Sequence, residues 1–136
     1  MTKNVIVLGS TGSIGQTSLR IISENKDLKI KLLTTNKNAN KLLYQAIKFN
    51  VKDVIIEDLK TYKKYKKNFN QKKIRLHHSH SIIDKILKKK NSYCINAISG
   101  IEGLEPTLKV IPFTKNILIS NKESISVVEE ISKNNN

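Results

Sequence analysis

The sequence predicts an α/β fold, a doubly wound and mainly parallel sheet with helices on both faces. Two observations lead to this class. Short runs rich in β-branched residues alternate with segments in which apolar residues recur at helical spacing. Most of the short runs are also continuously apolar, which is typical of strands covered by helices on both sides. The length of 136 residues suits one domain with its own core.

The apolar runs and the periodic segments between them give the order of the elements. The segments predicted as strands are Asn4–Gly9, Leu28–Thr34, Val51–Glu57, Ile74–His78, Tyr93–Ser99 and Asn116–Ser120. The segments predicted as helices are Ser13–Glu24, Asn40–Phe49, Leu59–Phe69, Ser81–Leu87, Ile101–Ile111 and Glu123–Ser132. We expect the domain to cover residues 1–130. Residues 131–136 are polar, and we expect a disordered tail there.

The net charge of +14 raises the question of a nucleic-acid partner. The cations are 23 lysines against two arginines. Sites that grip phosphates in a defined geometry favour arginine, so we attribute the charge to a general lysine-rich drift. Tyr62, Tyr65 and Phe69 lie among lysines, but their spacing places them on one helical face and predicts a core stripe. We expect no nucleic-acid partner, with a binder held by charge alone as the alternative.

The cellular compartment is predicted from three negative observations. No apolar run approaches the length of a membrane span, and no signal peptide is visible. Cys94 is the only cysteine and cannot form an intrachain disulfide. We therefore expect no membrane association and a location in the bacterial cytoplasm or an organelle interior.

Three of the five glycines, Gly9, Gly12 and Gly15, lie between the first strand and the first helix. In a Rossmann-like unit the first glycine allows a tight turn, the second lets the backbone approach a pyrophosphate, and the third lets the helix pack closely. The amide groups at the start of the helix then bind the phosphates. Hydroxyl groups of Ser10, Thr11 and Ser13 are further possible donors. The alternative is a tight turn without a ligand.

The loop after the second strand indicates which nucleotide binds. NAD sites place an acidic residue there for the ribose 2′-hydroxyl, but no carboxylate occurs from Leu28 to Asn50. Lys37 and the amides of Asn36 and Asn38 are present instead. A cation without an anion favours the 2′-phosphate of NADPH. The alternative is an ordinary capping loop before the helix at Asn40.

Three motifs together resemble one enzyme family. They are "LGSTGSIG" (Leu8–Gly15), "NAISGIEGLEPTL" (Asn96–Leu108) and "ILISNKES" (Ile117–Ser124). Their order and intervals resemble the N-terminal NADPH-binding domain of the 1-deoxy-D-xylulose 5-phosphate reductoisomerase family, from Asn4 to about Glu129. The resemblance implies the conversion of that substrate to 2-C-methyl-D-erythritol 4-phosphate in isoprenoid biosynthesis, with NADPH and a divalent metal, Mg or Mn. It also implies a homodimer.

The resemblance also assigns roles to residues. The implied nucleotide contacts are Gly9, Thr11, Gly12, Ser13, Ile14, Asn36, Lys37, Asn38, Asn121 and Glu123. Lys122 is the implied contact with the phosphosugar substrate. Asn36 stands where the family usually has glycine, and asparagine tolerates a left-handed backbone better than most residues.

The family's metal motif, substrate pocket and most of its dimer contacts would follow this chain. We therefore expect no catalytic residue and no metal ligand here, weak NADPH binding, and no turnover by the chain alone. One alternative is another NADP-dependent oxidoreductase of the semialdehyde dehydrogenase type, which needs a nucleophilic cysteine. Another is a non-catalytic remnant. His77, His78 and His80 lack a nearby carboxylate in sequence, so we interpret them as a strand end rather than a metal site.

Overall fold

A computed structural model describes residues 2–119 and 122–134. Within these residues one sheet of six strands has the order β4-β3-β2-β1-β5-β6, and every neighbouring pair is parallel. The strands are β1 (Lys3–Leu8), β2 (Leu28–Thr35), β3 (Asp53–Ile56), β4 (Arg75–His78), β5 (Asn91–Asn96) and β6 (Thr114–Ile119). The predicted doubly wound, Rossmann-like α/β class is confirmed.

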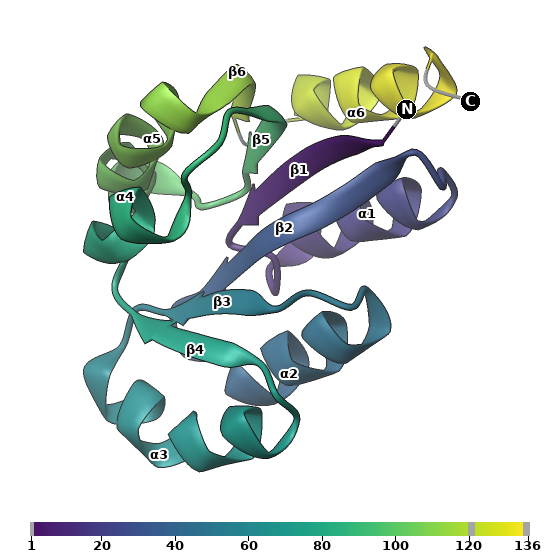
Figure 1. The fold of residues 1–136 in the computed structure, drawn as a ribbon. Helices are drawn as coiled ribbons and strands as arrows, with labels where there is room; N and C mark the ends of the chain where they lie inside the picture. Colours follow the sequence, from purple (N-terminus) through teal and green to yellow (C-terminus); the bar gives the residue numbers. More distant parts are fainter. Residues whose placement is uncertain (1, 120–121, 135–136) are drawn as a thin grey trace.

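Helices cover both faces of this sheet (Figure 1). The α-helices are α1 (Ser13–Ser23), α2 (Ala39–Lys48), α3 (Leu59–Gln71), α4 (Ile83–Ile86), α5 (Leu104–Val110) and α6 (Lys122–Asn134). Short 3-10 turns are η1 (His80–Ile82), η2 (Gly100–Gly103) and η3 (Ile111–Phe113). Helices α1, α2 and α3 lie on one face, where Ile131 of α6 also meets the sheet, whereas α4 and α5 lie on the other.

The core has two parts, one on each face of the sheet. Val5 and Val7 of β1 point into the part beneath α1, α2 and α3. Ile6 and Leu8 of the same strand point into the part beneath α4 and α5. All four side chains are buried. Because both faces are covered, the strand is continuously apolar, as the sequence indicated.

The aromatic stripe of α3 packs as predicted. Phe69 is fully buried, and Tyr62 and Tyr65 pack partly buried against the same cluster. Asp58 caps the start of the helix and accepts a hydrogen bond from the Thr61 amide at 3.1 Å. The aromatic rings are therefore part of the fold.

Two helices differ from their predicted form. The helix expected over Ser81–Leu87 consists of the 3-10 turn η1, which begins at His80 after Ser79 with φ of +72°, and the short α4. The helix expected over Ile101–Ile111 begins as the 3-10 turn η2. Sequence periodicity does not separate these forms, since both bury one apolar side.

The predicted disordered tail is wrong for residues 131–134, which continue α6. Ser132 is buried there, and its carbonyl accepts a hydrogen bond from Asn25 Nδ2 at 2.6 Å. This contact joins residues more than 100 positions apart, so local polarity gave no sign of it. It holds the end of α6 against the segment after α1.

Candidate nucleotide-binding site

The candidate site lies at the carboxyl ends of the strands, where the direction of the sheet reverses. The chain moves outward from β1 to β4 and then returns to place β5 on the other side of β1. In open α/β sheets such a switch point leaves a crevice between the loops. A cavity of about 380 Å³ opens there. Its lining residues are Gly9, Thr34, Thr35, Asn36, Glu57, His80, Ile98, Glu102, Glu105 and Pro106.

Two of the three glycines are required by the fold itself. Gly9 has φ of +72°, and a Cβ atom there would lie 2.9 Å from Ile98 Cγ1. At Gly15, a Cβ atom would lie 2.3 Å from the Gly9 carbonyl oxygen and 2.7 Å from the Ser10 backbone. These distances agree with the predicted tight turn at Gly9 and the close helix packing at Gly15.

Gly12 differs from both of them. Its φ of −80° suits any residue, and a Cβ atom there would come no closer than 3.9 Å to a neighbouring atom, the Gly9 oxygen. Neither a clash nor the backbone conformation therefore requires glycine at this position. A ligand that approaches the backbone closely would require it, which is the role expected of the second glycine.

The start of α1 faces outward, and no side chain caps it. The Gly12 amide donates to the Gly9 carbonyl oxygen at 3.4 Å. Gly12 is the N-cap, it supplies no side-chain hydrogen bond, and the first turn holds no acidic residue. Gly12 and Ser13 are exposed, and Ile14 is partly exposed. A helix of 11 residues that begins in this way presents amide donors and a partial positive charge to an anion.

Two hydroxyl groups of the turn are occupied within the protein. Ser10 is fully buried, and its Oγ donates to Gln45 Oε1 at 2.7 Å. The prediction that this hydroxyl meets a phosphate is therefore wrong, because the side chain points into the core. Thr11 Oγ1 lies 2.6 Å from Thr35 Oγ1, so it ties the turn to β2.

The loop that follows β2 places its three polar residues at the surface. Asn36, Lys37 and Asn38 are all exposed, and Asn36 borders the cavity. Asn38 also caps α2, accepting from the Lys41 amide at 3.2 Å. The capping alternative therefore holds for Asn38 but leaves the other two residues uncommitted. Asn36 is not among the residues with positive φ, so this backbone does not demand the glycine usual in the family.

Carboxylates that are distant in sequence approach this loop. Glu57, which follows β3, lines the cavity beside Asn36. Hydrogen bonds from Thr61, followed by the charges of Lys37 and Lys60, lower the pKa of Asp58. Residues 28–50 contain no acidic residue, but acidic residues from elsewhere in the chain thus lie near Lys37 in the fold. A search restricted to the second strand and its loop misses both side chains.

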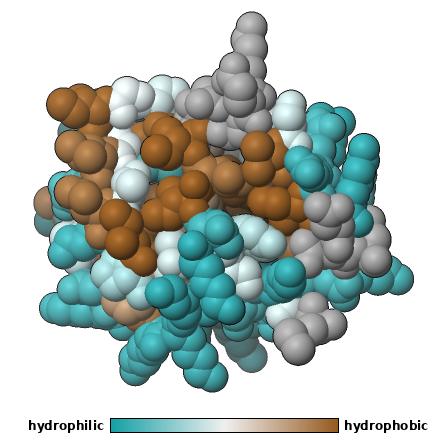
Figure 2. All heavy atoms as spheres, turned by 90° about the horizontal axis from the view of Figure 1, so that it is seen from above, coloured by the Kyte–Doolittle hydropathy of each residue, from teal (hydrophilic) through white to brown (hydrophobic). Residues whose placement is uncertain are grey.

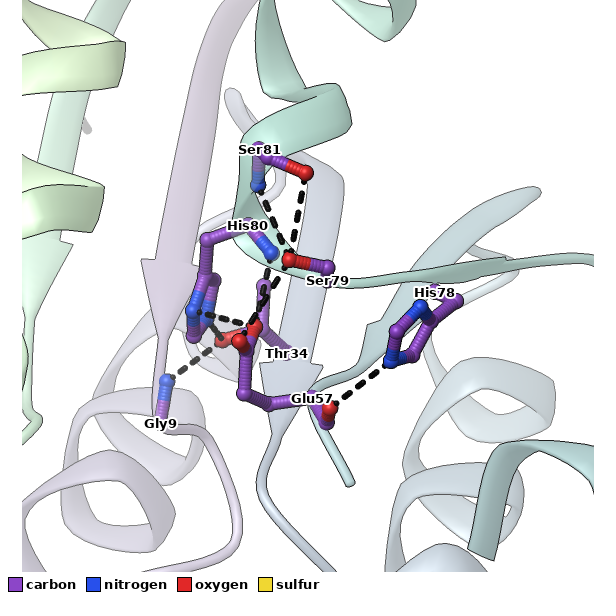
Figure 3. Close-up of polar contacts among 7 residues, drawn as sticks. All are labelled: Gly9, Thr34, Glu57, His78, Ser79, His80 and Ser81. Carbon is purple, nitrogen blue, oxygen red and sulfur yellow. Dashed lines mark hydrogen bonds and ion pairs between the residues drawn. The ribbon is translucent and has the colours of Figure 1, made fainter. Parts of the chain in front are cut away.

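Sequence reasoning also missed the polar wall of the cavity (Figure 3). Glu57 Oε2 accepts from the His80 amide at 2.7 Å and lies 2.9 Å from His80 Nδ1. His80 Nε2 lies 3.3 Å from Thr34 Oγ1, which accepts from the Gly9 amide at 2.9 Å. Only their positions in the sequence could have indicated that Glu57 and His80 line the cavity, because each follows the end of a strand.

The three histidines contact different partners. His77 lies 3.0 Å from Asp53, which Arg75 also contacts, and His78 lies 3.1 Å from the Glu57 carbonyl oxygen. Burial alone would raise the pKa of Asp53, but His77 and Arg75 bring it well below its ordinary range. Within residues 2–119 and 122–134, no three His, Cys, Asp or Glu side chains are arranged to hold a metal ion.

The second predicted contact region follows β6. Asn121 lies outside the described residues, as do the side chains of Lys122 and Glu123, so their predicted contacts stay predictions. The backbone of Lys122 begins α6. Because all paired strands are parallel, the carboxyl end of β6 lies at the same edge of the sheet as the glycine turn.

Comparison with known proteins identifies the family. A family model described as 1-deoxy-D-xylulose 5-phosphate reductoisomerase matches residues 5–128. The chain belongs to this family. The reductoisomerase of Pelagibacter ubique is 44% identical over 126 residues, which make up 90% of this chain and 32% of that protein. The reductoisomerase of Buchnera aphidicola is 39% identical over 129 residues, or 92% and 32% of the two chains. The chain spans about a third of the length of these relatives.

Solved structures of reductoisomerases have the same fold. The Zymomonas mobilis enzyme in complex with NADPH superimposes with a TM-score of 0.79 and 26% identity, over 99% of this chain and 37% of that one. A structure with fosmidomycin and magnesium gives 0.77 and 26%, over 98% and 35%. The chain corresponds to the N-terminal NADPH-binding domain region of the family. In the described parts of the chain, no helix is long and apolar enough to span a membrane.

Cys94 is not placed to act as the nucleophile that a semialdehyde dehydrogenase needs. It lies within β5, fully buried, and burial raises the pKa of its thiol to about 12. We expect no reaction with Ellman's reagent near neutral pH in the native chain, and one thiol per chain after unfolding in guanidinium. Rapid labelling of the native chain would contradict this burial.

Proposed function

We propose that the chain binds NADPH and forms the nucleotide-binding part of a 1-deoxy-D-xylulose 5-phosphate reductoisomerase. The observation that carries this proposal is Gly12: neither a clash nor a positive φ demands glycine there, yet a residue without a capping side chain stands at the exposed start of α1. A diphosphate that lies against Gly12 and is bound by the amides of Ser13 and Ile14 accounts for it. The Zymomonas mobilis reductoisomerase, whose structure was solved in complex with NADPH, supports the same nucleotide.

The charges around the crevice indicate which part of the nucleotide binds on each side. The phosphates face the start of α1, and the 2′-phosphate faces Lys37. The cavity behind Asn36 is bordered by Glu57, Glu102 and Glu105. These carboxylates disfavour a phosphate and accept hydrogen bonds from hydroxyl or amine donors. The uncharged adenosine portion therefore fits that side of the crevice.

Conversion of 1-deoxy-D-xylulose 5-phosphate requires more than this region. In the proposed enzyme, Lys122 contacts the phosphosugar, and Asn121 and Glu123 contact the nucleotide. A divalent metal would need other ligands in the complete enzyme, because the described residues hold no cluster that fits one. We propose that the metal ligands belong to the other two thirds of a family-length protein and that the chain alone does not turn over.

Thermal unfolding with and without nucleotide tests the proposed cofactor. Binding to the native state alone raises the melting temperature with ligand concentration. We expect NADPH to raise the melting temperature of the chain, and NADH at the same concentration to raise it less. An unchanged melting temperature with millimolar NADPH would reject nucleotide binding.

Replacing Lys37 by alanine tests the preference for NADPH. The variant loses one charge-assisted contact with the 2′-phosphate, so we expect its Kd for NADPH to rise about tenfold while its Kd for NADH stays within about twofold. Isothermal titration measures both values. The matched control is Lys48→Ala, which removes the same charge from the opposite end of α2. If both variants lost the same affinity for NADPH, the effect would come from net charge and not from a contact with Lys37.

An apolar patch on α5 and its surroundings supports the proposal of a larger enzyme. Ile101, Leu104, Leu108 and Ile111 are between 49% and 85% exposed, and Ile119 at the end of β6 is also exposed. Figure 2 shows apolar side chains gathered on the upper face that carries α5 and β6. Apolar clusters of this kind usually mark contacts. We assign the patch to the remaining two thirds of a family-length protein.

A chimaera tests this assignment. This chain replaces the corresponding third of the Pelagibacter ubique enzyme, and Leu104 and Leu108 are changed to lysine. If the patch is covered, the two charges lower the stability of the chimaera by several kcal/mol, because they are buried without partners. In the chain alone the same changes cost less than about 1 kcal/mol, as on any surface.

The control for this pair is Tyr44→Lys, an exposed apolar residue on α2. It should leave both proteins unchanged. Equal stability of the Leu104→Lys, Leu108→Lys chimaera and the unaltered chimaera would contradict the assignment.

A further inference from the structure

The turn between β4 and η1 directs one histidine into the sheet. Ser79 has φ of +72° and ψ of 142°, a conformation that is strained for any residue but glycine. His80, the next residue, is 8% exposed although the other two histidines of the segment are partly exposed. A strained residue persists where its surroundings hold it. Here the strained turn places His80 at the wall of the nucleotide crevice (Figure 3).

Glu57 holds this turn through three donors. Its Oε2 accepts from the His80 amide at 2.7 Å and lies 2.9 Å from His80 Nδ1, and its Oε1 accepts from Ser79 Oγ at 3.4 Å. The side chain thus joins the end of β3 to the turn after β4. It also selects the tautomer of His80, because a carboxylate at Nδ1 requires a hydrogen on that nitrogen.

This tautomer of His80 allows a series of hydrogen bonds that reaches the glycine turn. With its hydrogen on Nδ1, His80 accepts at Nε2, and the Thr34 hydroxyl 3.3 Å away donates to it. The same Thr34 oxygen accepts from the Gly9 amide at 2.9 Å, and the Thr34 carbonyl accepts from the Ser10 amide at 2.9 Å. Each polar atom in this path has a consistent donor or acceptor role.

We propose that His80 is a positioning residue for nucleotide binding, which acts through Thr34 to hold the Gly9 amide and so the turn that presents Gly12–Ile14 to the diphosphate. This inference rests on the proposed function for its ligand. It goes beyond that function because neither His80 nor Thr34 needs to touch the nucleotide.

The arrangement makes the turn sensitive to pH. Burial lowers the pKa of His80 below its ordinary value of 6.5, and the charges of Glu57 and Glu105 oppose this only partly. The third carboxylate at the cavity is Glu102. A protonated His80 donates at both nitrogens, so the Thr34 hydroxyl loses its acceptor. The stability from the neutral form is present above pH 6.5 and is lost as the pH falls toward the lowered pKa.

Nuclear magnetic resonance on the ¹⁵N-labelled chain tests the coupling without any nucleotide. We expect the Gly9 amide shift to follow the titration of the His80 ring, with the same midpoint. The transition is absent in His80→Gln and unchanged in the control His77→Gln, which removes a histidine bonded to Asp53 instead. In Thr34→Val we expect the Gly9 amide to exchange with solvent at least about tenfold faster.

Nucleotide titration then tests positioning. We expect the Kd for NADPH to rise about tenfold in His80→Ala and less in His80→Gln, which keeps a donor and an acceptor, and to be unchanged in His77→Gln. A Gly9 shift independent of His80 overturns the inference, and the unaltered chain decides this without relying on a variant that folds. Unchanged NADPH binding in a folded His80→Ala also overturns it. Absence of NADPH binding to the unaltered chain instead rejects the proposed function, and the positioning role with it.

Discussion

Replacing Gly15 by alanine is expected to destabilise the chain by about 3 kcal/mol or to prevent folding. The added Cβ atom would lie 2.3 Å from the Gly9 oxygen and 2.7 Å from two backbone atoms of Ser10. All three are backbone atoms, so no side-chain rotation relieves the clash, and α1 must move away from the turn. Overpacking with backbone movement costs about 1–3 kcal/mol and occasionally more.

Urea unfolding followed by circular dichroism measures this effect. A Gly15→Ala variant within about 0.5 kcal/mol of the unaltered chain would show that α1 does not approach the turn as closely as described. The matched control lies in the same motif, because alanine at Gly12 adds the same methyl group without a clash.

Gly12→Ala is expected to keep the fold and lose the ligand. Alanine is a poorer N-cap than glycine, so we expect a loss of stability of about 0.5–1 kcal/mol. The Kd for NADPH should rise at least about tenfold, because the methyl group occupies the space through which the diphosphate reaches the amides of α1. Isothermal titration at a temperature where both proteins are folded gives the comparison.

The pair separates structure from function within one motif. Gly15→Ala should be seen in unfolding, whereas Gly12→Ala should be seen mainly in binding. If Gly12→Ala bound NADPH as tightly as the unaltered chain, the diphosphate would not lie against this turn.

Local patterns in the sequence were sufficient for the sheet and the glycine turn. The continuous apolar run of β1 and the helical spacing of Tyr62, Tyr65 and Phe69 are visible in any short window. The roles of Gly9 and Gly15 follow from the position of a turn between a strand and a helix. The positive φ of Gly9 and the close approach of Gly15 to Gly9 and Ser10 are local, whereas the contact of Gly9 with Ile98 is not.

The features that sequence reasoning missed depend on distant neighbours. Glu57 reaches the cavity because β3 pairs with β2, and His80 reaches Thr34 across 46 positions. Ser10 resembles a phosphate donor in the motif, but Gln45 of α2 holds it in the core. Ser132 is polar, yet Asn25 gives it a buried partner. No pattern along the chain reports such pairs, because the sheet order brings them together.

A titration of the ¹⁵N-labelled chain with NADPH, followed amide by amide, shows directly where the nucleotide binds. We expect saturable shifts concentrated at Gly12, Ser13 and Ile14 and at Lys37, with small changes along α3. Shifts concentrated on the lysines of α3, or no saturable shift at the start of α1, would contradict this expectation.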